Sequence, residues 1–153
     1  MNKMIVGLTV GIAIFVLSFC LAHAQTAADL QATIERHYAA INGNDSPTYK
    51  SHHLPDMSIF FGNGSPLMNT NTWEAQKRVG LKSEPWDSNV FIQGFSAQIY
   101  GNVGIALFYL TGSVTQGDST QRGTWRVTAV WVHENGTWKE AHHHESPLVG
   151  VRH

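Results

Sequence analysis

The chain has little cysteine and little charge, and each shortage excludes a class of protein. Its one cysteine, Cys20, lies in an apolar N-terminal segment. If that segment is removed, the remaining chain has no disulfide, no thiolate nucleophile and no cysteine-ligated metal. Charged residues make up only 14% of the sequence, and the lysines and arginines are scattered along it. Because a nucleic-acid-binding surface requires clustered cations, we expect no nucleic-acid partner.

The first 24 residues have the pattern of a cleavable signal peptide. Lys3 supplies a positive start, a long apolar run follows, and the run ends in an Ala-His-Ala motif of the kind that signal peptidase recognises. The sequence therefore predicts cleavage between Ala24 and Gln25 and export to the periplasm or beyond. The mature chain, residues 25–153, is expected to be a single domain that has no membrane segment after cleavage.

Two alternatives to a cleaved signal peptide remain at this stage. One is a retained membrane anchor, because the apolar run is close to the roughly 17 to 25 residues that span a bilayer. The other is a lipoprotein modified at Cys20, which Phe19 disfavours because a small residue usually precedes such a cysteine.

Helical patterns occupy the start of the mature chain. Residues 27–41 place apolar side chains on one stripe, and Asn42-Gly43 predicts a helix end with left-handed backbone. Ser46-Pro47 predicts the N-cap and first turn of a short helix that reaches about His53 and ends before Pro55. A short strand is expected over residues 57–61 and a third helix over residues 72–79.

From about residue 89 the pattern changes to strands separated by tight turns. Four strands are predicted, over residues 89–100, 103–115, 120–133 and 137–145. Asn135-Gly136 is the clearest hairpin turn, since both central residues of a type I′ turn need positive φ. Helices followed by a meander predict an α+β fold in which the N-terminal helices pack on a curved antiparallel sheet. Such a fold is expected to leave a cone-shaped cavity that holds the functional site.

Three stretches carry a family resemblance: HYAAINGND at residues 37–45, PDMSIF at residues 55–60, and VWVHENGTWK, which continues into HHHES, within residues 130–146. Together they resemble the nuclear-transport-factor-2-like superfamily, in particular its SnoaL-like branch and the association domain of calcium/calmodulin-dependent protein kinase II. The resemblance covers nearly all of residues 27–148 and implies the cone-shaped α+β fold. It implies no single activity, because the superfamily contains isomerases, cyclases, dehydratases and modules that only bind or assemble.

The ketosteroid isomerases of this superfamily offer a test of activity. They use a carboxylate base and an oxyanion hole made of a tyrosine and a protonated aspartic acid. Matching the first helices places Tyr38 at the oxyanion tyrosine, and matching the last hairpins places Thr128 at the protonated acid. The base position falls near Phe61 or Gly62. Because only one of three roles is present, we expect no steroid isomerisation.

The resemblance and the strand alternation select a set of candidate site residues. Tyr38 would line the pocket, or alternatively pack in the core. If the protein is an enzyme, Tyr38 and His143 are the catalytic candidates: Tyr38 would polarise a carbonyl, and His143 or another histidine at the pocket edge would act as the base. Arg126 and Thr128 share one strand face, and if that face looks into the cavity then Arg126 could hold an anionic ligand. The aromatic side chains of the first half would line or cover the pocket. The candidate binding set is Tyr38, Phe60, Trp73, Arg126, Thr128 and His143.

Histidine is the unusual feature of the composition, with nine residues in all, three of them consecutive. Strand alternation places His142 and His144 on one face and His143 on the other. The pair His142 and His144 could bind a metal if a third ligand joined it, and the candidates for that ligand are His37, His52, His53 and Glu140. We favour instead a pair that contacts neighbouring strands or a subunit interface, so the sequence predicts no metal site. We expect no cofactor.

These observations predict an exported SnoaL-like domain that binds a small apolar or amphipathic molecule and forms a homodimer through its sheet. One alternative is a small-molecule isomerase, cyclase or dehydratase with a pocket histidine as base. Another is an assembly module, which would use an outer sheet face that carries Trp125 and Trp131.

Overall fold

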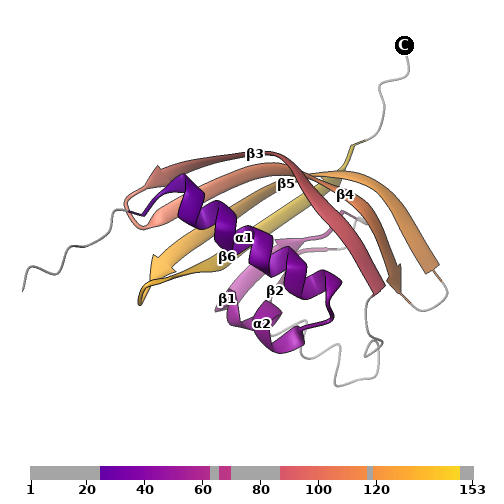
Figure 1. Ribbon diagram of the computed structural model, residues 1–153, viewed down its shortest axis with the longest axis horizontal. Coiled ribbons are helices and arrows are strands. Elements are labelled where there is room, and N and C mark those ends of the chain that lie inside the picture. The colour runs from indigo at the N-terminus through magenta and orange to yellow at the C-terminus, as the bar shows by residue number, and fades with distance from the viewer. Residues whose placement is uncertain (1–24, 63–65, 70–86, 117–118, 149–153) are drawn as a thin grey trace, which may run out of the picture.

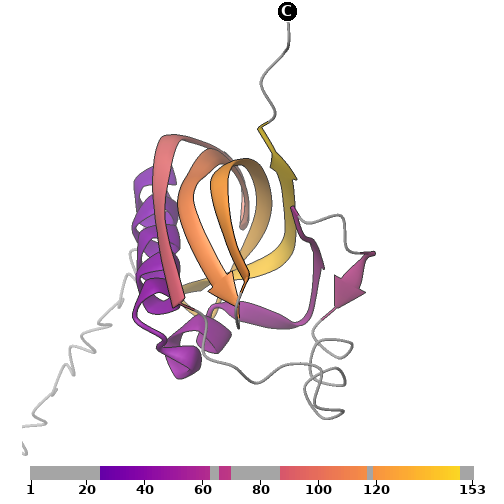
Figure 2. The ribbon, with the colours of Figure 1, turned by 90° about the vertical axis from the view of Figure 1, so that its right-hand side faces the viewer.

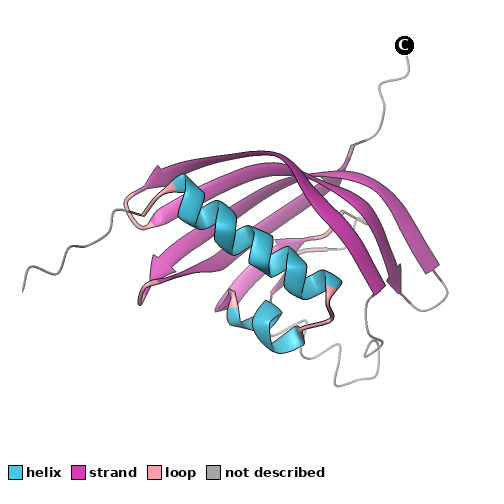
Figure 3. Cartoon of the chain, viewed as in Figure 1, coloured by secondary structure: helices cyan, strands magenta, loops and turns pink. Residues whose placement is uncertain are grey.

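The computed structural model describes residues 25–62, 66–69, 87–116 and 119–148. The predicted signal peptide, the predicted third helix and Trp73 lie outside these residues. Two helices lie against one face of a curved sheet (Figure 1, Figure 3). No helix within the described ranges combines the length and the apolar character that crossing a membrane would require.

Helix α1 (Ala27–Asn42) begins in a capping box. The Thr26 hydroxyl accepts a hydrogen bond from the Asp29 amide, and the Asp29 carboxylate accepts one from the Thr26 amide. The predicted apolar stripe faces the sheet and is buried at Leu30, Ile34 and Tyr38. The helix ends near the predicted pair, but Gly43 has φ −89° and the left-handed residue is Asn44, at φ 54°. The prediction was therefore right about the end of the helix and one residue early for the left-handed backbone.

Helix α2 (Ser46–Ser51) is short and carries proline in its first turn, as predicted. Its N-cap is Asp45 rather than Ser46, because the Asp45 carboxylate accepts a hydrogen bond from the Thr48 amide. It ends before His53, which already belongs to strand β1 (His53–Phe60) and pairs with the strand that comes last along the chain.

The described residues form one sheet of six strands in the order β2-β1-β6-β5-β4-β3. Strands β3 to β6 form the predicted antiparallel meander, while β1 runs parallel to β6 and β2 pairs antiparallel with β1. The predicted fold class is therefore confirmed, with one parallel pair that the sequence did not indicate, because the first strand inserts beside the last. The remaining strand bounds are β2 (Met68–Asn69), β3 (Asp87–Tyr100), β4 (Val103–Gln116), β5 (Ser119–Glu134) and β6 (Thr137–Pro147).

The main core lies between α1 and the sheet face that packs against it, called here the inner face. Along β5 the inner face carries Trp125, Val127, Ala129 and Trp131, all buried. This corrects the hypothesis of an assembly surface built on the two tryptophans, because both indole rings lie inside the domain. The alternating residues of β5 face outward, and the long strands curve around the interior (Figure 2).

Asn42 fixes the end of α1 to the edge of the sheet. Its side-chain amide donates to the Val90 carbonyl oxygen at 2.8 Å, and its side-chain oxygen accepts from the Val90 amide at 3.0 Å. The side chain thus takes the place of a neighbouring strand for one residue of β3. This contact sets the position of the helix face that carries His37 over the sheet.

Candidate functional site

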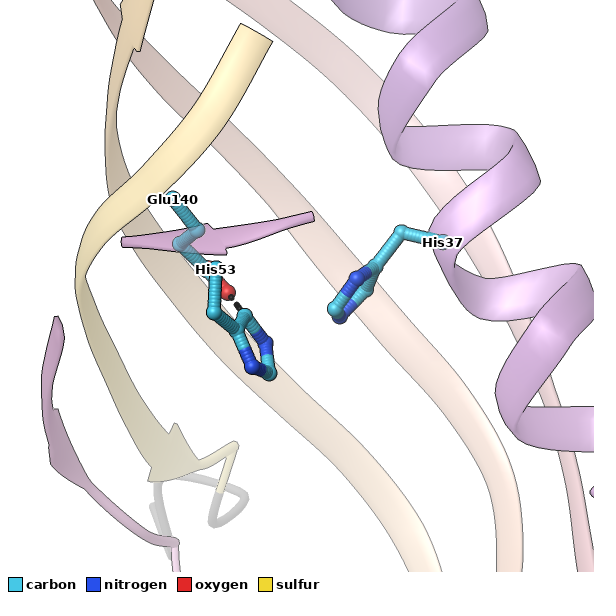
Figure 4. Close-up of side chains that lie close together, drawn as sticks. All are labelled: His37, His53 and Glu140. Carbon is cyan, nitrogen blue, oxygen red and sulfur yellow. Dashed lines mark ion pairs between the residues drawn. The ribbon is translucent and has the colours of Figure 1, made fainter. Parts of the chain in front are cut away.

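Three side chains from three separate elements meet inside the domain: His37 of α1, His53 of β1 and Glu140 of β6 (Figure 4). His37 follows the apolar stripe of α1, so it points toward the sheet and is only 3% exposed. His53 and Glu140 are partners in the register of the parallel strand pair, and the Glu140 amide donates to the His52 carbonyl oxygen at 2.7 Å. Secondary structure therefore holds all three at fixed positions.

One ligand atom from each of these three residues lies within 4.8 Å of the other two. His53 Nε2 is 3.5 Å from Glu140 Oε2, which is an ion-pair distance but lacks the geometry of a hydrogen bond. Glu140 is 2% exposed, so its charge is almost completely removed from water. A carboxylate in such a place needs partners, since an unpaired buried charge is costly.

Glu140 has its main partner in His143, and the contacts continue to Glu145. His143 Nδ1 is 2.8 Å from Glu140 Oε1, and His143 Nε2 is 3.3 Å from Glu145 Oε2. The Gly62 amide donates to the other oxygen of Glu145 at 3.2 Å. The imidazole is therefore held between two carboxylates, and the chain of contacts runs along the inner face from His53 to Gly62.

The charges in this chain of contacts are set by burial and by pairing. Burial alone would lower the pKa of His143, but the charge of Glu140 and the hydrogen bonds to both carboxylates raise it to about 10. Burial alone would raise the pKa of Glu140, but the charge of His143 and its hydrogen bond to the carboxylate hold that pKa well below its usual range. His143 is thus an imidazolium at neutral pH and donates to both neighbours, which disfavours its predicted role as a base.

His37 behaves in the opposite way. Burial lowers its pKa to about 3, with Glu140 only partly offsetting the effect, so its imidazole is neutral. Burial also lowers the pKa of His52 and raises that of Tyr38. Neutral imidazoles therefore lie beside a charged Glu140 and His143 pair.

Several polar atoms in this region are buried without a hydrogen-bond partner from the described protein. Four of them belong to residues around His37: His37 Nδ1, His52 Nδ1, His53 Nε2 and Trp131 Nε1. The ring of His37 lies 5.3 Å from that of His53, 5.7 Å from that of His52 and 5.7 Å from that of Trp131, measured between centroids. Unpartnered buried polar atoms are uncommon in native proteins, and here they gather around one histidine.

Aromatic rings enclose this polar group. Between ring centroids, Tyr49 of α2 lies 4.8 Å from His37 and 4.4 Å from His53. The ring of Tyr38 meets that of His37 edge-on, with the centroids 5.2 Å apart. The site therefore combines polar nitrogen and oxygen atoms with apolar ring faces, which suits a ligand of mixed character.

Comparison with known protein families shows which family the chain belongs to. Residues 30–150 match the SnoaL-like domain family. This chain belongs to that family. No curated protein sequence is significantly similar to this SnoaL-like protein.

Solved structures confirm the predicted nuclear-transport-factor-2-like (NTF2-like) fold for this SnoaL-like protein. An NTF2-like protein from Cytophaga hutchinsonii superposes with a TM-score of 0.68 at 15% identity, over 81% of this chain and 99% of that one. The hub of CaMKII from S. rosetta gives a TM-score of 0.64 at 18% identity, over 81% and 98%. A protein described as a candidate dehydratase of the NTF2-like family, from Streptomyces avermitilis, gives 0.65 at 15% identity, over 81% and 96%. At these identities the likeness shows the fold alone.

The structure of the SnoaL-like domain places only part of the predicted binding set together. Tyr38 and His143 are both buried on the inner side, at 6% and 4% exposure. Arg126 and Thr128 are exposed on the opposite face, and Phe60 is 39% exposed. The expectation that the Arg126 face looks into the interior was therefore wrong, because the small and aromatic residues of β5 take the inner positions and fit under α1.

His142 and His144, the weak candidates for a metal pair, are not part of the inner-face cluster. His142 Nδ1 is hydrogen-bonded to Ser58 Oγ at 2.8 Å, and His144 is exposed beside Phe60. Strict alternation would put Glu140 on the face of these two histidines. A bulge after Glu140 shifts the phase instead, since Glu140 pairs with Trp131 of β5, while His142, two residues later, pairs with the adjacent residue Val130. Glu140 consequently shares the inner face with His143 and Glu145, whose role the sequence did not reveal.

Proposed function

We propose that this SnoaL-like protein is an exported domain that binds a small amphipathic molecule on the inner face of its sheet, against His37 and its neighbours. The observation that carries the proposal is the gathering of four buried, unpartnered polar atoms around His37. Each such atom costs about 1–3 kcal/mol when nothing satisfies it. A molecule that forms hydrogen bonds to these atoms would offset that cost, and its apolar part would contact the rings of Tyr38 and Tyr49.

Export is supported by the fact that the described contacts of the domain begin directly after the predicted cleavage point. The capping box of α1 uses Thr26 and Asp29, and the Gln25 side chain lies 2.9 Å from His133 Nδ1. Cleavage between Ala24 and Gln25 would leave all of these contacts in place. Combined with the signal-peptide pattern of the first 24 residues, this supports a mature protein in the periplasm or outside the cell.

Native mass spectrometry of the protein purified from its own host tests both parts of the proposal. We expect an intact mass that begins at Gln25 and an additional bound organic mass that is lost on denaturation. The variant His37→Phe keeps an aromatic ring but removes both nitrogen atoms, so it should be purified without that mass. Arg126→Ala changes only the outer face and should retain it. Retention by His37→Phe, or loss from Arg126→Ala alone, would place the ligand elsewhere.

We also propose that the outer sheet face pairs with a second copy of the chain. Three large apolar side chains on neighbouring strands are exposed there: Phe91 at 57%, Leu107 at 39% and Tyr109 at 43%. Adjacent exposed apolar residues are characteristic of an interface, and a two-fold pairing would bury the same patch on both copies.

Light scattering after size exclusion tests this pairing. The protein is expected to elute with the mass of a dimer at micromolar concentration, and Leu107→Glu is expected to give a monomer because it would bury a charge within the patch. Tyr100→Ser removes an exposed aromatic ring at the tip of the same hairpin and should remain dimeric. A monomeric wild-type protein would contradict the proposal.

A further inference from the structure

We propose that His37, His53 and Glu140 form a binding site for one divalent transition-metal ion. The site uses the same buried cluster as the proposed ligand site, but it does not depend on the organic ligand. Figure 4 shows the three side chains pointing toward one another from a helix and two strands.

The donor set fits this class of ion. Two imidazoles and one carboxylate are the protein ligands of several catalytic zinc sites, and the same combination binds iron(II) in a facial arrangement with open positions. Magnesium and calcium prefer oxygen ligands alone. A site with two nitrogen donors and one oxygen donor is therefore expected to select a first-row transition ion, and Zn²⁺ is the suitable probe.

The distances require only a small contraction. Three atoms that lie 4.8 Å apart at most are within about 2.8 Å of their common centre, whereas bonds from zinc to nitrogen or oxygen are roughly 2.0–2.2 Å long. Each ligand atom thus has to move by less than about 1 Å, which side-chain rotation can supply. The unpartnered His37 Nδ1 and His53 Nε2 are available for coordination, since no hydrogen bond to described protein occupies either atom.

The surroundings of Glu140 already have the form of an outer shell around a metal ligand. Its Oε2 faces His53, while its Oε1 is held by His143 Nδ1 at 2.8 Å. His143 is fixed in turn by Glu145, which accepts from the Gly62 amide. Such partners orient a ligating carboxylate and are typical of metal centres. They leave the oxygen that faces the histidines free to coordinate.

The experiment uses the full chain purified without a polyhistidine tag, stripped with a chelator and titrated with Zn²⁺ in a calorimeter. We expect one Zn²⁺ per chain. His37→Phe and His53→Phe, which keep the ring packing, should each weaken the affinity by at least about 100-fold, the upper end of what loss of an outer-shell partner costs. The double variant His142→Ala/His144→Ala alters the outer-face histidines of the same strand and should bind as the wild type does.

A spectroscopic measurement complements the calorimetry. Co²⁺ bound to the wild-type protein should show the intense visible absorption of a site with few ligands, and Zn²⁺ should abolish it, so the test does not depend on how well a variant folds. Saturation well below one ion per chain, unchanged affinity in both phenylalanine variants, or loss of binding only in the outer-face double variant would each overturn the assignment. Because no organic ligand is present, failure here leaves the proposed ligand binding separately testable.

Discussion

Replacing Glu140 with leucine is expected to lower the free energy of unfolding by about 3–5 kcal/mol, the usual cost of removing one partner of a buried ion pair. Glu140 is 2% exposed and its Oε1 lies 2.8 Å from His143 Nδ1. Without it, the His143 imidazole keeps only the longer contact to Glu145 and must either remain charged in an apolar region or lose its proton. Urea denaturation of metal-free protein measures the loss.

Two further variants separate the ion pair from simple packing. The double variant Glu140→Leu/His143→Leu should be clearly more stable than Glu140→Leu alone, because replacing both members of a buried pair by apolar residues is often close to neutral. Glu134→Leu changes an exposed glutamate at the end of β5 and should alter stability by less than about 0.5 kcal/mol. The single variant His143→Leu completes the comparison. If the loss of unfolding free energy in the double variant equals the sum of the losses in Glu140→Leu and His143→Leu, the two charges do not interact as described.

Gly112→Ala is expected to destabilise the protein by at least about 3 kcal/mol, through backbone strain and overpacking together. Gly112 in β4 has φ 145°, which an alanine rarely adopts. An added Cβ would clash with the carbonyl oxygen of Asn89 and lie 2.9 Å from the Val90 Cα, both backbone atoms of β3. Neither atom can move without breaking the pairing of these strands. Urea denaturation again measures the effect.

The cross-strand neighbour of Gly112 provides a matched control. Gly123 pairs with it in the register of β4 and β5, yet a Cβ at Gly123 would meet only the Trp125 ring, at 3.8 Å. Gly123→Ala should therefore change stability by less than about 1 kcal/mol in either direction. Equal losses in the two variants would show that strand glycines matter here for a general reason rather than through the close approach of β3.

The secondary structure was largely predictable, because its signals are local. The stripe of α1 repeats with the helical period, and the meander is marked by its tight turns, among them Asn135-Gly136, where both residues have positive φ as the turn type requires. The parallel pairing of β1 with β6 was missed, since it joins segments at opposite ends of the domain and nothing in either segment specifies the partner.

The candidate site was predictable in its residue types but not in its geometry. His37, His53 and Glu140 were all named, but only as candidates for a third ligand beside the weak pair His142 and His144, and no site made of these three was predicted. The bulge after Glu140 could not be foreseen, and one extra residue moves every later side chain of a strand to the other face. The prediction that Arg126 and Thr128 line the site was wrong for a related reason. Strand alternation defines two faces of the sheet but does not say which face the helix covers.

The sequence by itself determined the histidine-rich composition, the α+β order of elements and the resemblance that the SnoaL-like match confirms, since periodicity, turns and motifs are properties of neighbouring residues. Only the tertiary structure decided that His37, His53 and Glu140 meet, and that Glu140 pairs with His143. These contacts join residues far apart in the chain through one parallel strand pair and one bulge. Burial keeps His37 neutral, while pairing keeps Glu140 and His143 charged, and these states follow from the packing of the inner face under α1, which makes the cluster the candidate functional site.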